Sequence, residues 1–296
     1  MTKLQMRNLS FLFLTAMIWG AAFVAQSVAV SYMAPNTFTC IRSLIASLAL
    51  LPVIFLFDRR KKGDTDPKIR KKSCKSVYIG GALCGIFLFG GSIFQQMGIQ
   101  HTSPGKAGFI TALYIVGVPL IGIFLKKKTG PFLWIGVVLA VAGLYFLCMT
   151  ENLSVGKGDG WLLLCALIFS CHILVVDHFI AFTDGLKMSC VQLFVCGLCA
   201  LFFMLALESP DPARILQGWK PLLYASVMSS GVGYTLQLLG QQDVNPTAAS
   251  LILSMESVFA ALSGALFLGQ ILSPRETLGC GLMFAAIILA QIPQKK

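Results

Sequence analysis

The feature that most constrains this chain is a series of apolar runs, each long enough to cross a lipid bilayer. A transmembrane helix needs roughly 20 apolar residues, because it rises about 1.5 Å per residue through a hydrocarbon core about 30 Å thick. We count ten such runs along the sequence, with few or no charged residues in each. They predict an all-α integral membrane protein with ten transmembrane helices.

The ten predicted spans follow one another with short connections. They are Leu9 to Tyr32, Pro35 to Phe57, Val77 to Gln100, Ala107 to Leu125, Pro131 to Met149, Gly160 to Phe182, Met188 to Leu207, Pro221 to Gln242, Pro246 to Gln270 and Pro274 to Ile292. Only 12% of the 296 residues are charged, about half the share of a soluble domain. This composition excludes a disordered chain, a coiled coil and a soluble enzyme.

The distribution of basic residues predicts the orientation. We expect the first span to be retained, because it is longer than the apolar part of a signal peptide and lacks a cleavage site. An even number of spans places both termini on one side, which also carries the basic run from Arg59 to Lys75. By the positive-inside rule that side is cytoplasmic. The expected location is the plasma membrane, which is the inner membrane of a bacterium.

The net charge of +11 has the same origin. The basic run is interleaved with aspartate and lacks aromatic residues, so it predicts contact with anionic lipid headgroups and no nucleic-acid binding. The ten cysteines lie almost entirely within the spans, where they act as small packing residues. We therefore predict no disulfide framework, no metal site and no cofactor.

The sequence contains an internal repeat. Residues 95–125 align with residues 237–267 at a constant offset of 142, which matches Gln95 with Gln237 and Pro104 with Pro246. A shorter match pairs Cys40-Ile-Arg42 with Cys190-Val-Gln192. We predict two halves, residues 1–152 and 153–296, with five helices each. Because five is odd, the second half enters the membrane inverted, as in transporters that expose a midplane site alternately to the two sides.

Several short motifs also resemble a known family. They are Ile18-Trp19-Gly20, Arg42, the prolines Pro104 and Pro246, Met255-Glu256-Ser257-Val258-Phe259 and Leu266-Phe267-Leu268-Gly269. In order and spacing they are similar to the EamA-like branch of the drug/metabolite transporter superfamily. The resemblance implies a ten-helix carrier of small metabolites, often an exporter of amino acids or related compounds. Ser257 and Gln270 depart from the family pattern, which has proline and an acidic residue there.

Glu256 is the clearest polar residue at membrane depth, near the centre of the ninth span. An ionisable group at that depth is costly unless it is paired or faces water. Glu256 could bind a substrate amine, or take up a proton as the carrier turns over. It could equally hydrogen-bond a neighbouring helix without changing state.

Three further polar residues lie within spans. Arg42 could extend to the surface, pair with Glu256, or hold a substrate carboxylate. The repeat-related Gln95 and Gln237 could flank a pseudo-twofold axis and bind a polar or zwitterionic solute, since an amide both donates and accepts. They could also join helices to each other.

Aromatic and imidazole side chains complete the candidate site. Trp19, Tyr114 and Tyr234 lie inside spans rather than at the interface, where they could line a cavity for an amphipathic solute or pack in the core. His172 is central in the sixth span and could relay protons or act as a structural hydrogen-bonding group. The eight candidate substrate-binding residues are therefore Trp19, Arg42, Gln95, Tyr114, His172, Tyr234, Gln237 and Glu256.

Other classes of protein explain the sequence less well. A membrane enzyme is disfavoured, because there is no nucleotide-binding Gly-Lys-Ser/Thr loop and no carboxylate pair within the spans. A receptor or assembly factor would need a larger soluble segment than any connection here. A channel also needs a lined path and stays an alternative. The prediction is a secondary transporter, proton-coupled or not, whose partners are a small solute and the bilayer. The oligomeric state is left open.

Overall fold

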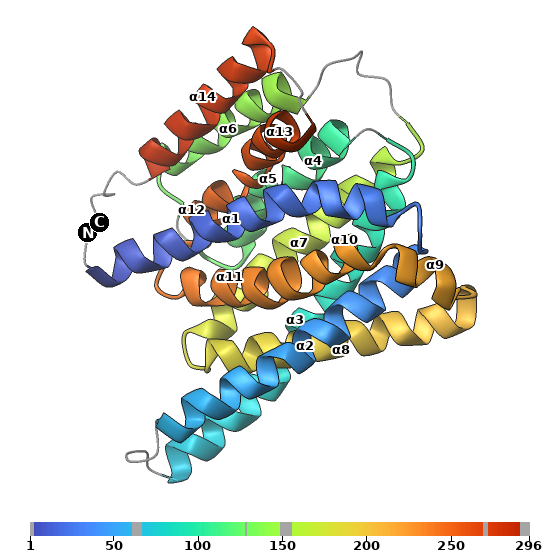
Figure 1. The fold of residues 1–296 in the computed structure, drawn as a ribbon. Helices are drawn as coiled ribbons and strands as arrows, with labels where there is room; N and C mark the ends of the chain where they lie inside the picture. Colours follow the sequence, from blue (N-terminus) through green and yellow to red (C-terminus); the bar gives the residue numbers. More distant parts are fainter. Residues whose placement is uncertain are drawn as a thin grey trace.

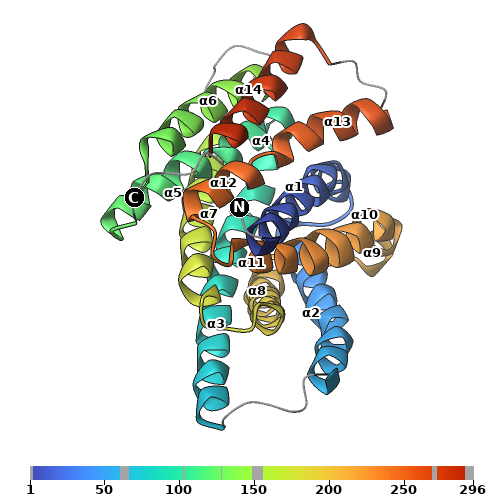
Figure 2. The same ribbon diagram turned by 90° about the vertical axis from the view of Figure 1, so that its left-hand side faces the viewer.

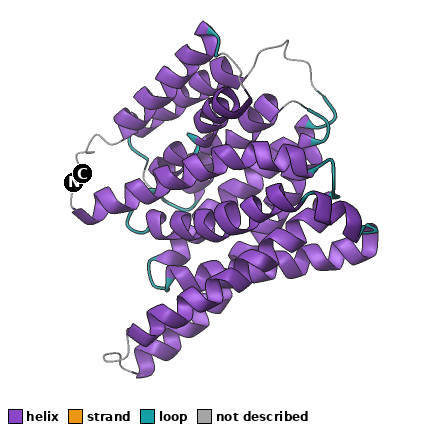
Figure 3. Cartoon of the chain, in the orientation of Figure 1, coloured by secondary structure: helices purple, strands orange, loops and turns teal. Residues whose placement is uncertain are grey.

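The computed structural model describes residues 3–60, 67–102, 104–127, 129–148, 156–268 and 272–290. Within these ranges every regular element is a helix (Figure 3), which confirms the predicted all-α class. Seven helical segments are long and apolar enough to cross a membrane, and Pro131–Leu147 is a shorter apolar helix. Gln270 and the predicted boundary after residue 152 lie outside the described residues.

The helices follow the ten predicted spans in order (Figure 1). The first half contains α1 (Lys3–Ala29), α2 (Pro35–Arg60), α3 (Pro67–Ile99), α4 (Pro104–Ala112), α5 (Tyr114–Phe124) and α6 (Pro131–Cys148). The second contains α7 (Asp159–Ile180), α8 (Gly185–Leu207), α9 (Pro212–Gln217), α10 (Trp219–Leu223), the π-helix η1 (Tyr224–Gly233), α11 (Tyr234–Gln241), α12 (Pro246–Leu253), α13 (Glu256–Leu268) and α14 (Pro274–Ala290). Proline begins many of them because its missing N–H needs no partner in a first turn.

The fourth and ninth predicted spans are each divided at the same place. Leu113 separates α4 from α5, and Ser254 with Met255 separates α12 from α13. At each break an N–H bonds the carbonyl three residues back, Leu113 to Ile110 at 3.2 Å and Met255 to Ile252 at 3.1 Å. This is the tighter 3₁₀ pattern. Leu113 and Met255 are related by the repeat offset, so the break is a property of both halves.

Proline does not explain these breaks. The sequence suggested a kink at Pro119, because an interior proline removes a helical hydrogen bond. Pro119 instead lies inside α5, beyond the break. The position that the offset relates to it in α13 is Ala261, and α12 and α13 are nevertheless separated. The interruption therefore does not require a proline.

The helices form two similar three-span groups. In the first, α1 packs against η1, α11, α12 and α13, and we name this group the α1 cluster. In the second, α7 packs against α3, α4 and α5, and we name it the α7 cluster. Each cluster combines one span from one half of the chain with two spans from the other half.

Two helix pairs flank the clusters (Figure 2). The pair α6 and α14 lies at one edge, and α2 packs against α8 near the other. Glu208, at the end of α8, accepts hydrogen bonds from the backbone N–H groups of Asn36 at 2.8 Å and Thr37 at 2.7 Å. A carboxylate is favourable at a helix N-terminus, so this contact fixes the start of α2.

The two ends of the bundle are named here by one residue each. The Asn8 end is the side on which α1 begins and α14 ends, at the left of Figure 1. The Glu208 end is the opposite side, where α1 ends and α2 begins. Both names are used below without reference to the two sides of a membrane.

Candidate functional site

A cavity of about 520 Å³ lies between the two clusters. All eight side chains selected from the sequence line it, namely Trp19, Arg42, Gln95, Tyr114, His172, Tyr234, Gln237 and Glu256. Six further lining residues were not selected, namely Phe23, Gln26, Phe169, Ile173, Ser229 and Leu253. The fold thus brings together residues from α1, α2, α3, α5, α7, η1, α11, α12 and α13.

Glu256 and Tyr114 connect the two clusters across the cavity. The hydroxyl group of Tyr114 donates a hydrogen bond of 3.1 Å to Glu256 Oε1, and both side chains are buried. The two residues are 142 positions apart, so they are equivalent in the repeat, and each is the first residue of a helix that begins after a break. The N-terminus of α13 favours a negative charge on Glu256.

Trp19 and Tyr234 form an aromatic wall. Their ring centroids lie 4.8 Å apart, at an interplanar angle of 57°. Trp19 Nε1 donates a hydrogen bond of 3.1 Å to the carbonyl oxygen of Ser229 in η1. Gly233 permits this approach, because a Cβ atom there would lie 2.6 Å from Trp19 Nε1. The wall is therefore held in place by packing and by a satisfied indole N–H.

Arg42 is buried, with 3% of its surface exposed. Its Nη2 donates a hydrogen bond of 2.9 Å to Ser92 Oγ, and its Cζ lies 5.2 Å from the centroid of the Phe38 ring. It does not extend to the surface, and among the described side chains it forms no ion pair with Glu256. Two of the arrangements considered from the sequence are thus not observed. The Nε atom of Arg42 is buried without a hydrogen-bond partner.

His172 and the repeat-related glutamines have different surroundings. His172 Nε2 and Gln192 Oε1 lie 3.1 Å apart and share a hydrogen bond, as expected for a structural histidine. Gln95 and Gln237 both line the cavity, but within the described part of the chain no hydrogen bond joins them. The Oε1 atom of Gln237 is buried and has no partner there.

Gln26 is the most informative residue that the sequence reasoning missed. Its Oε1 accepts a hydrogen bond of 3.0 Å from Gln96 Nε2, which joins α1 to α3 toward the Glu208 end. Trp19, Phe23 and Gln26 are spaced as neighbours on one face of a helix. Extending the face of Trp19 along the first span would have identified both Phe23 and Gln26.

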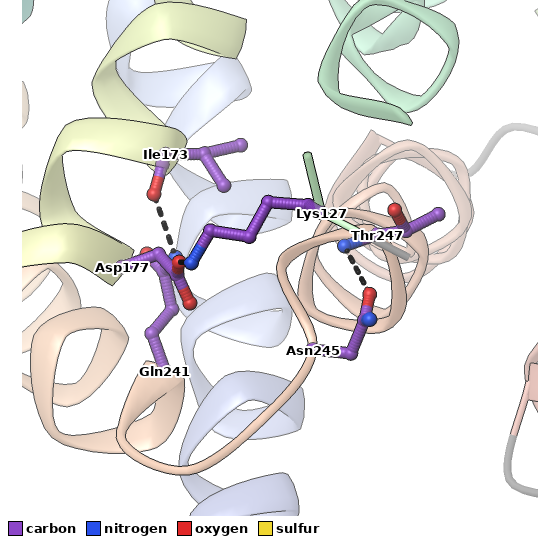
Figure 4. Close-up of polar contacts among 6 residues, drawn as sticks. All are labelled: Lys127, Ile173, Asp177, Gln241, Asn245 and Thr247. Atoms are coloured by element: carbon purple, nitrogen blue, oxygen red, sulfur yellow. Dashed lines mark hydrogen bonds and ion pairs between the residues drawn. The ribbon is translucent and has the colours of Figure 1, made fainter. Parts of the chain in front are cut away.

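Polar contacts close the cavity toward the Asn8 end (Figure 4). Gln241 is fully buried, and its Nε2 donates a hydrogen bond of 3.1 Å to the carbonyl oxygen of Ile173, a residue that also lines the cavity. Nearby, Lys127 Nζ and Asp177 Oδ2 form an ion pair of 2.6 Å. Asn8 Nδ2 donates a hydrogen bond of 2.7 Å to the carbonyl oxygen of Gln242.

Comparisons with known proteins agree with this geometry. The model of the EamA-like transporter family matches residues 6–149 and, separately, residues 156–291. An uncharacterized transporter of Archaeoglobus fulgidus is 28% identical over 94% of this chain and 84% of its own. The Escherichia coli inner membrane transporter YedA, also uncharacterized, is 23% identical over 95% of this chain and 89% of its own.

One relative has a printed substrate, and one solved structure shares the fold. The threonine/homoserine exporter RhtA of Escherichia coli is 25% identical over 72% of this chain and 70% of its own. A protein of known crystal structure superposes with a TM-score of 0.77, at 15% identity, over 96% of each chain. At that identity the superposition concerns the fold alone.

Proposed function

This chain belongs to the EamA-like transporter family, and we propose that it is a secondary transporter that moves a small amphipathic metabolite by alternating access. The observation that carries this proposal is the buried cavity between the two clusters, with Glu256 and Arg42 in its lining. Buried ionisable groups within membrane spans are expensive, and they typically mark the path of a substrate or an ion.

We propose that the architecture is ten helices in two inverted repeats, meeting between residues 152 and 153. Three observations support this. The family model matches the chain twice, the partners of α1 correspond to those of α7, and the breaks at Leu113 and Met255 are repeat-related. Inverted repeats permit two alternative packings around one fixed site.

We propose that both termini face the cytoplasm and that the protein resides in a bacterial inner membrane. The basic residues of the sequence favour this orientation, and the relative YedA is named as an inner membrane transporter. The Asn8 end is then the cytoplasmic end. In the described conformation its contacts close the cavity on that side.

An amino acid is the first candidate substrate, and export is the first candidate direction. The aromatic wall of Trp19 and Tyr234 suits an apolar side chain, and the amides of Gln95 and Gln237 suit polar groups. The name of RhtA also favours an amino acid. Glu256 would bind the amine of the solute or carry a coupled proton.

Reconstitution tests this function directly. In proteoliposomes we expect saturable counterflow of labelled L-threonine or L-homoserine, because a carrier exchanges bound solute at each turn. Protein-free vesicles are the control, and the measurement is repeated with and without a pH gradient. Flux that does not saturate and shows no counterflow would identify a channel, while the absence of flux with a folded protein would favour a receptor.

The contact between Gln241 and Ile173 provides a second prediction. Substitution of Gln241 with Leu should loosen the Asn8 end, because it leaves the carbonyl of Ile173 without its donor at a cost of about 1–3 kcal/mol. Hydrogen–deuterium exchange should rise in residues 170–180 and 237–245. The matched control is Asp177→Asn, since a partly exposed ion pair contributes only about 0–1 kcal/mol. Equal exchange in both variants would contradict a closing role for Gln241.

A further inference from the structure

We propose that Arg42 binds a carboxylate group of the transported solute and so makes the cavity selective for solutes that carry one. This inference rests on the proposed function and assigns a role within the same cavity. Its basis is the environment of Arg42 itself, together with the equivalent position in the other half of the chain.

The environment of Arg42 lacks the counter-charge that a buried guanidinium needs. A guanidinium group has five N–H donors, of which one bonds Ser92, while Nε has no partner in the described structure. The ring of Phe38 lies against the group and carries no formal charge. Buried charges in proteins are paired or face a ligand, and Arg42 lines the cavity.

The other half of the chain shows that packing does not require a charge at this position. Gln192 is the repeat-related counterpart of Arg42, and Cys40 and Cys190, which precede them, are both buried. The side chain of Gln192 bonds His172 and is absent from the lining of the cavity. A neutral amide therefore suffices to join the helix at that site. The positive charge of Arg42 occurs only where the side chain reaches the cavity.

The charge on the opposite cluster completes the argument. Glu256 lies in the α1 cluster and is bonded by a neutral phenol, whereas Arg42 lies on α2. The two groups line one cavity without pairing to each other, as far as the described residues show. A solute with one carboxylate and one ammonium group neutralises both. The cavity thus matches a zwitterion with its carboxylate at Arg42.

Competition between two closely related compounds tests the assignment. The purified protein is incubated with labelled L-threonine, and unlabelled L-threonine or L-threoninamide is the competitor. The amide keeps the ammonium group and the side chain but replaces the carboxylate with a neutral group. We expect the wild-type protein to bind L-threoninamide more weakly by about tenfold or more, the equivalent of one charge-assisted hydrogen bond.

Variants then assign the discrimination to Arg42. Substitution of Arg42 with Gln, the residue of the other half, should bring the two competitors within about twofold of each other. Arg42→Lys should keep part of the preference, since it retains the charge but loses the planar fork. The control Arg59→Gln removes an arginine from the same helix that is exposed and stacked on Phe55, and it should behave as the wild type.

The failure of this inference differs from the failure of the proposed function. If the wild-type protein transports L-threonine but binds L-threoninamide equally well, Arg42 is not a carboxylate site and the transporter proposal stands. The same conclusion follows if folded Arg42→Gln retains the wild-type preference. If no amino acid binds or shows counterflow, both the amino-acid substrate and the Arg42 site are overturned.

Discussion

Substitution of Glu256 with Gln is expected to reduce counterflow to near the level of protein-free vesicles, while the protein remains folded. Glutamine has the same size and can still accept the hydrogen bond from Tyr114, so the packing of α13 should persist. The variant loses the negative charge that would pair with an ammonium group. Removing one partner of a buried charge pair costs about 2–5 kcal/mol, which corresponds to binding that is weaker by roughly 30-fold or more.

The matched control for this charge removal is Glu276→Gln. Glu276 lies in the first turn of α14 as Glu256 lies in the first turn of α13, but it is bonded to Ser273 and lies outside the cavity lining. Its substitution should leave counterflow unchanged. If Glu256→Gln abolishes only the response to a pH gradient, Glu256 carries a proton. Unchanged rates and unchanged pH dependence would exclude a functional role.

Substitution of Gly20 with Ala is expected to destabilise the protein and to impair transport together. An added Cβ atom would collide with Cβ of Phe259, and it would lie 2.7 Å from the carbonyl oxygen of Glu256 and 2.8 Å from the amide nitrogen of Ala260. These backbone atoms belong to α13, so relief requires α1 and α13 to separate. Overpacking of this kind costs about 1–3 kcal/mol, and any displacement of α13 moves Glu256 with it.

Gly281 provides the opposite expectation for the same substitution. It lies in α14, and a Cβ atom there would have nothing within 4 Å. Alanine at a helical position otherwise stabilises by about 0.5–1 kcal/mol relative to glycine. Thermal unfolding in detergent should therefore show a lower transition for Gly20→Ala and an equal or higher one for Gly281→Ala. A higher transition for both would show that the α1–α13 contact yields without cost.

Much of the site could be predicted from the sequence, for a simple physical reason. In a membrane span, polar side chains such as Glu256, Gln237 and Arg42 must avoid lipid, so their presence alone indicates the interior. All eight selected residues do line one cavity, although their role in binding stays a prediction. Gln26 was missed because glutamine is the least conspicuous of these groups, and its signal is its spacing from Trp19.

Other features could not be read from local pattern. The division of two spans at Leu113 and Met255 leaves the apolar run intact, and the π-helix η1 occurs where the equivalent segment of α3 is α-helical. Hydrophobic length reports only that a segment is buried in lipid or protein. It does not report how the backbone hydrogen bonds shift within the segment.

The sequence by itself determined the helical class, the order of the helices and which side chains are excluded from lipid, because these depend on local length and polarity. Only the tertiary structure decided that α1 packs with helices of the other half. It also decided that Tyr114 meets Glu256 and that Arg42 meets Ser92. Many pairings would satisfy the same polar groups, and the choice among them depends on the packing of helices that are distant in the chain.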